Sequence, residues 1–209
     1  MISPSRRVFA VAIWAGLMIA MAVPVALAAA SPYLAYRDLP YIVGGFAGIV
    51  ALALLLVQPL LAAGYLPGVR RTTERRWHRL VGMAIVAGVF LHIAGLYLTS
   101  PADTLDALML VSPTPFSVYG VLAMWTAVVI AVLVALRRRL GLRYSVWRLI
   151  HNGLALIVVV ATVIHALQIE GAMETVSKWA LCLAVLTATG VTLMDQRVVR
   201  PLFRRRKRR

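Results

Sequence analysis

The chain has 209 residues, of which 62% are hydrophobic and 14% are charged, and its net charge is +15. Soluble domains carry roughly 45–50% apolar and about 25% charged residues, so this composition excludes an ordinary soluble globular protein. The single cysteine excludes an internal disulfide and a cysteine-based metal site. Because the basic residues gather at the ends of apolar runs, we expect no nucleic-acid partner.

Six apolar runs follow one another along the chain. They cover residues 8–30, 41–66, 77–99, 116–136, 145–169 and 176–194. A membrane-spanning helix needs about 20 apolar residues, so each run is long enough. The first run also resembles a signal peptide, whose apolar part is only about 7–15 residues long, and we favour a retained helix. The prediction is an all-α bundle of six transmembrane helices over residues 1–195, followed by a basic cytoplasmic tail over 196–209.

The basic residues lie almost entirely on one side of this predicted bundle. Twenty of the 22 lysines and arginines fall in the two termini and in the loops 67–79 and 137–148. The other side holds only Arg37 and Lys178, with five of the seven acidic residues. Because positively charged loops stay in the cytoplasm, both termini are predicted to be cytoplasmic. The basic tail is also expected to contact anionic membrane lipid.

The four histidines form two pairs with the same spacing. His78 and His92 lie 14 residues apart on the third run, and His151 and His165 lie 14 apart on the fifth. On an α-helix this spacing turns through about 1400°, within about 40° of whole turns, and rises about 21 Å. Each pair therefore occupies one face of its helix. A histidine inside a membrane is energetically costly, because its polar nitrogens find no water there. The rise excludes a single metal site formed by all four histidines.

The third and fifth helices run in the same direction, so His78 must be level with His151 and His92 with His165. This arrangement predicts two six-coordinate haems, stacked between the two helices. Ligation by two histidines fills both axial positions of the iron and favours electron transfer over binding of small ligands. No catalytic residue is assigned.

The neighbours of the histidines are compatible with a ring cofactor. Small and branched residues lie between the histidines on the predicted ligand faces, namely Gly82, Ile85, Val89, Ala155, Val158 and Thr162. Ordinary helix packing also favours small residues. Three arginines flank His78 and His151, the histidines near the predicted cytoplasmic ends of their helices, namely Arg75, Arg79 and Arg148. They are candidate partners of haem propionates, but a role as positive charges that set the membrane orientation explains them equally well. Trp77 and Trp147 are interpreted as interfacial anchors.

Paired histidines on the third and fifth of six helices resemble the ferric reductase-like transmembrane domain. This family includes ferric reductases, NADPH oxidases and the haem-binding subunit of the methionine-sulfoxide reductase system. The segments 98–101, 111–116 and 165–171 are similar to bacterial predicted ferric reductases in particular. The resemblance implies that the four matching histidines hold two b-type haems in a bacterial inner (plasma) membrane. It also implies that electrons pass from cytoplasmic NAD(P)H through FAD to the outer face.

The segment 198–202 resembles the start of the junction to a flavin- and nicotinamide-binding module, but no Gly-x-Gly-x-x-Gly motif follows it. We therefore expect FAD or FMN only through a partner, either a cytoplasmic flavin/NAD(P)H reductase or a ferredoxin. The favoured acceptor is ferric iron or a ferric chelate. One alternative is a haem subunit serving a periplasmic redox partner such as methionine-sulfoxide reductase. Another is a non-redox transporter or scaffold whose histidines move protons or metal ions.

Overall fold

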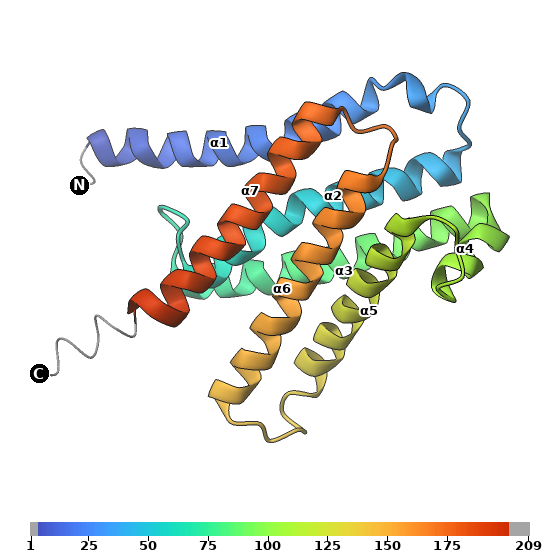
Figure 1. Ribbon diagram of the computed structural model, residues 1–209. Coiled ribbons are helices and arrows are strands. Elements are labelled where there is room, and N and C mark those ends of the chain that lie inside the picture. The colour runs from blue at the N-terminus through green and yellow to red at the C-terminus, as the bar shows by residue number, and fades with distance from the viewer. Residues whose placement is uncertain (1–3, 201–209) are drawn as a thin grey trace, which may run out of the picture.

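The computed structural model describes residues 4–200, and all the regular secondary structure in that range is helical, without strands (Figure 1). The elements are α1 (Pro4–Ala29), the 3-10 turn η1 (Pro32–Leu34), α2 (Leu39–Ala63), α3 (Arg71–Thr99), α4 (Pro101–Leu108), α5 (Pro115–Leu136), α6 (Tyr144–Gln168), α7 (Thr175–Met194) and the π-helical turn η2 (Asp195–Val199). Six helices of the described chain are long and apolar enough to cross a membrane, which confirms the predicted six spans. The protein is therefore a multi-pass membrane protein, and its third and fifth spans are α3 and α6.

Local sequence sets where the helices begin and end. Proline occupies the first turn of α2, α4 and α5, where its missing N–H costs nothing. Helix α2 ends at Gly64, which takes the left-handed conformation (φ 72°) that glycine adopts without strain. Helix α7 begins at Glu174, whose carboxylate accepts the N–H groups of Val176 and Ser177. The bonds from Ser177 and Val176 hold the pKa of Glu174 below its usual value.

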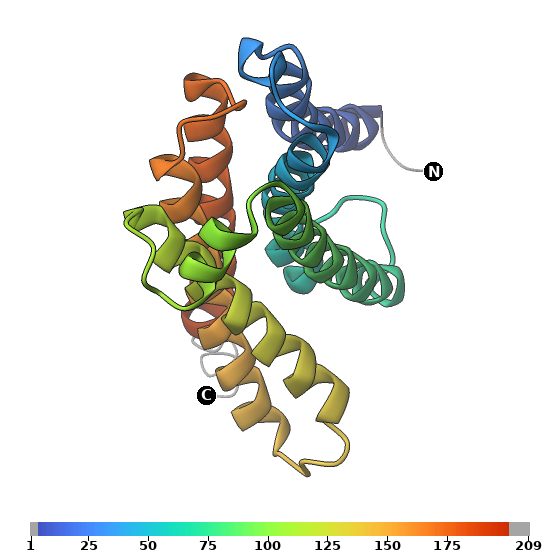
Figure 2. The same ribbon diagram turned by 90° about the vertical axis from the view of Figure 1, so that its right-hand side faces the viewer.

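The helices form two antiparallel pairs. Helix α2 packs along α3, helix α5 packs along α6, and α7 packs against both α2 and α6. Figure 2 shows the pairs in separate layers, with α2 and α3 on one side and α5 and α6 on the other. Helix α1 rests against α2 and α7 and exposes much of its apolar surface, as a helix in contact with lipid does.

The buried core lies where the two layers meet. It draws side chains from α2, α3, α5, α6 and α7, among them Leu52, Leu56, Ile85, Ala127, Val158, Leu181 and Val185. Ile85 and Val158 occupy the predicted ligand faces of α3 and α6, between their histidines. The level between the two histidine pairs is therefore closed by apolar side chains.

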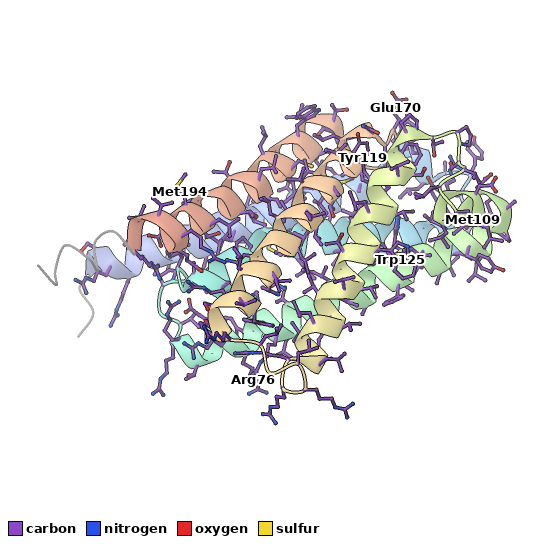
Figure 3. All side chains as sticks on the ribbon, turned by 60° about the horizontal axis from the view of Figure 1, so that its bottom comes forward. Arg76, Met109, Tyr119, Trp125, Glu170 and Met194 are labelled. Carbon is purple, nitrogen blue, oxygen red and sulfur yellow. The ribbon has the colours of Figure 1, made fainter. Side chains whose placement is uncertain are left out.

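Charge separates the two ends of the bundle. Figure 3 shows Arg76 at the end where α5 is connected to α6, and Glu170 at the opposite end. At the basic end, the hydroxyl of Tyr65 donates a hydrogen bond to the carboxylate of Asp195, which also forms a 2.7 Å ion pair with Arg200. Burial, and then the bond to Asp195, raises the pKa of Tyr65 above its usual value. These contacts fix the end of α7 to the connection between α2 and α3.

Candidate functional site

The four histidines meet as two pairs across the interface between the layers. The ring centroids of His78 and His151 are 6.3 Å apart, and those of His92 and His165 are 6.4 Å apart. The planes within each pair are inclined at 72° and 78°. The rings come together level by level, as two helices of the same direction require.

Three of the four rings are oriented by a backbone carbonyl. The Nδ1 atoms of His92 and His165 lie 2.8 Å from the carbonyl oxygens of Gly44 and Phe116. The Nδ1 atom of His78 lies 3.2 Å from the carbonyl oxygen of Gln58. Because a carbonyl only accepts, Nδ1 must carry the hydrogen, and Nε2 is left with its lone pair free. Histidines that bind metals are held in this way, with the second ring nitrogen bonded to an outer partner.

His92 and His165 also lie against glycines. A Cβ atom at Gly48 would stand 3.0 Å from Nδ1 of His92, and one at Gly120 would stand 2.8 Å from Nδ1 and Cε1 of His165. Gly48 follows Gly44 by four residues on α2, and Gly120 follows Phe116 by four on α5. Each of these two rings is therefore held by one carbonyl, and a glycine one helical turn away leaves room for it.

His151 differs from the other three histidines. Its Nδ1 atom is buried and has no hydrogen-bond partner among residues 4–200. The indole ring of Trp147 instead stacks on the imidazole, with centroids 5.2 Å apart and planes 13° apart. Trp77 meets Trp14 edge-on at 6.4 Å, although it also precedes a histidine of a pair. The interpretation of both tryptophans as anchors alone is therefore incomplete for Trp147.

The flanking arginines occupy different environments. The side chains of Arg75 and Arg79 are exposed. Arg148 is half-buried, and its Nε atom is buried without a hydrogen-bond partner in the described part of the chain. The Nε1 atom of Trp147 is also buried and unpartnered over the same range. The Nε–H donor of Arg148 thus lacks an acceptor among the described residues at the level of His78 and His151, which suits an anionic group such as a propionate.

The spacing of the rings fits one metal ion between each pair. A metal–imidazole bond of about 2.0–2.1 Å places two ring centroids on opposite sides of an ion about 6 Å apart. The observed separations are 6.3 and 6.4 Å. Within residues 4–200 no three His, Cys, Asp or Glu side chains are grouped to hold a metal ion by themselves. A porphyrin would supply four equatorial ligands to an iron held by either pair of histidines.

Several residues that hold the rings were not predicted from the sequence. They are Gly44, Gly48, Gln58, Phe116 and Gly120. The one available signal was Gly120, the single glycine in the apolar run 116–136. The carbonyl groups left no signal, because every residue carries one.

The six apolar helices define a multi-pass membrane protein in which two pairs of histidines meet at two levels. The family model for the ferric reductase like transmembrane component matches residues 47–162. This match covers more than half of the 209 residues, so the chain belongs to that family. It includes His78, His92 and His151 and ends three residues before His165. No curated protein and no solved structure matches the chain.

Proposed function

We propose that the protein is a di-haem b electron carrier that moves electrons from a cytoplasmic donor to the periplasmic face, with ferric iron or a ferric chelate as the favoured acceptor. The observation that carries this proposal is the meeting of two histidine pairs at two levels of α3 and α6. His78 and His151 would hold the inner haem, and His92 and His165 the outer one. An iron with two imidazole ligands takes up and releases one electron without binding a small ligand.

The residues around the histidines favour haem binding at both levels. The carbonyls of Gln58, Gly44 and Phe116 fix three rings with Nε2 free, and Arg148 supplies a buried N–H donor for a carboxylate. Ile85 and Val158 are buried apolar side chains between the two levels. In this proposal both termini lie in the cytoplasm of a bacterium. The reason is that they lie at the basic end of the bundle, and positively charged loops stay in the cytoplasm.

The first prediction is two haems for each chain. Purified protein should show a Soret band, a reduced-minus-oxidised spectrum of b type, and a haem-to-protein ratio close to two. The reason is that each level provides two imidazoles at a separation suited to one iron. A ratio of one in a fully loaded preparation would contradict the two-level arrangement. A preparation without a Soret band would instead support a non-redox transporter or scaffold.

The second prediction concerns the basic tail. Arg204 to Arg209, which lie outside the described residues, add six positive charges. Electrostatic steering accelerates docking of an acidic partner and weakens steeply with ionic strength. If the tail docks a cytoplasmic flavoprotein or ferredoxin, the intact protein should show a steeper salt dependence of haem reduction than protein truncated after Phe203. Equal rates and salt slopes would leave the tail as a topology signal that touches anionic lipid, at about 1 kcal/mol per basic residue.

A further inference from the structure

We propose that the stacked rings of Tyr144 and Trp147 form the electron entrance of the protein. They would be the contact through which an acidic one-electron donor protein in the cytoplasm couples to the His78/His151 pair. This inference rests on the proposed function and adds to it a docking point and two residues that couple the donor to the inner pair.

The rings form a continuous stack from the surface to the inner pair. The centroids of Tyr144 and Trp147 are 6.0 Å apart with planes at 25°, and Trp147 continues to His151 at 5.2 Å and 13°. Tyr144 is 59% exposed, whereas His151 is half-buried. The three residues are spaced by three and four, so they share one face of α6. A protein that touches Tyr144 is therefore connected to the inner histidine level by conjugated rings.

Two arginines lie over the exposed end of this stack. The guanidinium carbon of Arg137 lies 4.2 Å from the centroid of Trp147 and 5.5 Å from that of Tyr144. The guanidinium carbon of Arg148 lies 5.8 Å from the centroid of Tyr144. These cation–π contacts fix the rings in place. They also place positive charge beside the exposed ring, so an acidic partner is the complementary one.

The two aromatic residues act as a coupling medium and not as redox centres. One electron leaves the reduced donor, whose flavin or iron–sulfur group is oxidised by one electron, and one ferric iron becomes ferrous. Tyr144 and Trp147 hold the same electrons and protons before and after the transfer, and no bond forms or breaks. Adjacent cations disfavour removal of an electron from these rings, which agrees with this role.

Helix α3 offers no matching stack in the described chain, although it carries the other inner histidine. The residue four positions before His78 is Glu74, which is buried and accepts the N–H of Leu66 at 3.2 Å. Trp77 precedes His78 by one position, so it points to another face of α3 and meets Trp14. The two tryptophans are therefore a natural pair for a test and its control.

The test compares Trp147→Leu, Trp147→Phe and the matched control Trp77→Leu in the haem-loaded protein. The measurement is the stopped-flow rate of haem reduction by a small acidic [2Fe–2S] ferredoxin reduced beforehand, and by dithionite. With ferredoxin we expect a several-fold slower reduction in Trp147→Leu, a smaller loss in Trp147→Phe and none in Trp77→Leu. With dithionite, which needs no docking surface, all rates should equal the wild-type rate. The haem-to-protein ratio and the low-spin ferric EPR spectrum should be unchanged.

Two results would overturn the proposal. One is a wild-type rate with ferredoxin in Trp147→Leu. The other is an equal loss with both reductants together with an altered EPR spectrum, which would mean that Trp147 only orients His151. If Trp147→Leu loses haem, Tyr144→Leu carries the same test, because Tyr144 is exposed and stacks on Trp147 rather than on a histidine. Wild-type protein without a Soret band would contradict the proposed function itself, which is a distinct outcome.

Discussion

Replacement of His92 or His165 by alanine is expected to remove the outer haem and to leave the inner haem in place. The haem-to-protein ratio should fall from two to one, and the remaining b-type spectrum should be that of the inner level. The physical reason is that each iron takes one imidazole from α3 and one from α6, and the two rings of the outer pair lie only 6.4 Å apart. Loss of either ring removes one of the two bonds that hold that haem.

Alanine substitutions of the two histidines at the other level provide the control for this experiment. His78→Ala and His151→Ala should remove the inner haem and leave the outer one. The levels are about 21 Å apart along the helices, and effects at separate sites of this kind usually add. If His92→Ala and His78→Ala produced the same residual spectrum, the pairing by level would be wrong. A variant that kept both haems would exclude its histidine as a ligand.

Hydropathy located the spans correctly but not the ends of the helices. Helix α3 begins at Arg71, six residues before the apolar run that starts at Trp77. The added residues are polar, and they extend the helix beyond the apolar zone, where Glu74 is buried against Leu66 and Arg71. Helix α4 was also unexpected, because its eight residues are too few and too polar to register as a span. An apolar run in the sequence indicates which residues contact lipid. A helix can extend beyond that run, because it continues for as long as its backbone hydrogen bonds are formed.

The sequence predicted which histidines meet, because helical spacing and parallel direction determine that geometry. It did not predict how each ring is held. The carbonyls of Gly44, Gln58 and Phe116 reach the rings through the packing of neighbouring helices, and this packing is a tertiary property. The only sequence signal for the different environments of Trp77 and Trp147 was their spacing from the next histidine. Trp77 precedes His78 by one residue, whereas Trp147 precedes His151 by four.

The largest effect from a small substitution is expected at Gly120. In a helix interior, glycine to alanine usually stabilises a protein by roughly 0.5–1 kcal/mol, because alanine loses less backbone entropy on folding. At Gly120 the new methyl group would stand 2.8 Å from Nδ1 and Cε1 of His165. The ring cannot turn away without breaking its 2.8 Å bond to the carbonyl of Phe116 and moving Nε2 away from His92. We therefore expect Gly120→Ala to lose most of the outer haem, as His165→Ala does.

Two other glycines calibrate this result. Gly48→Ala would place its methyl group 3.0 Å from Nδ1 of His92, so a smaller loss of outer haem is expected. A Cβ atom at Gly153 would meet nothing within 4 Å, so Gly153→Ala should keep both haems and unfold at an equal or higher temperature. The measurements are the haem-to-protein ratio and the thermal unfolding temperature of the three variants in one detergent. If Gly120→Ala retained two haems, His165 would have to sit differently on α6, and its Nδ1 bond to Phe116 would not be what orients the ring toward His92.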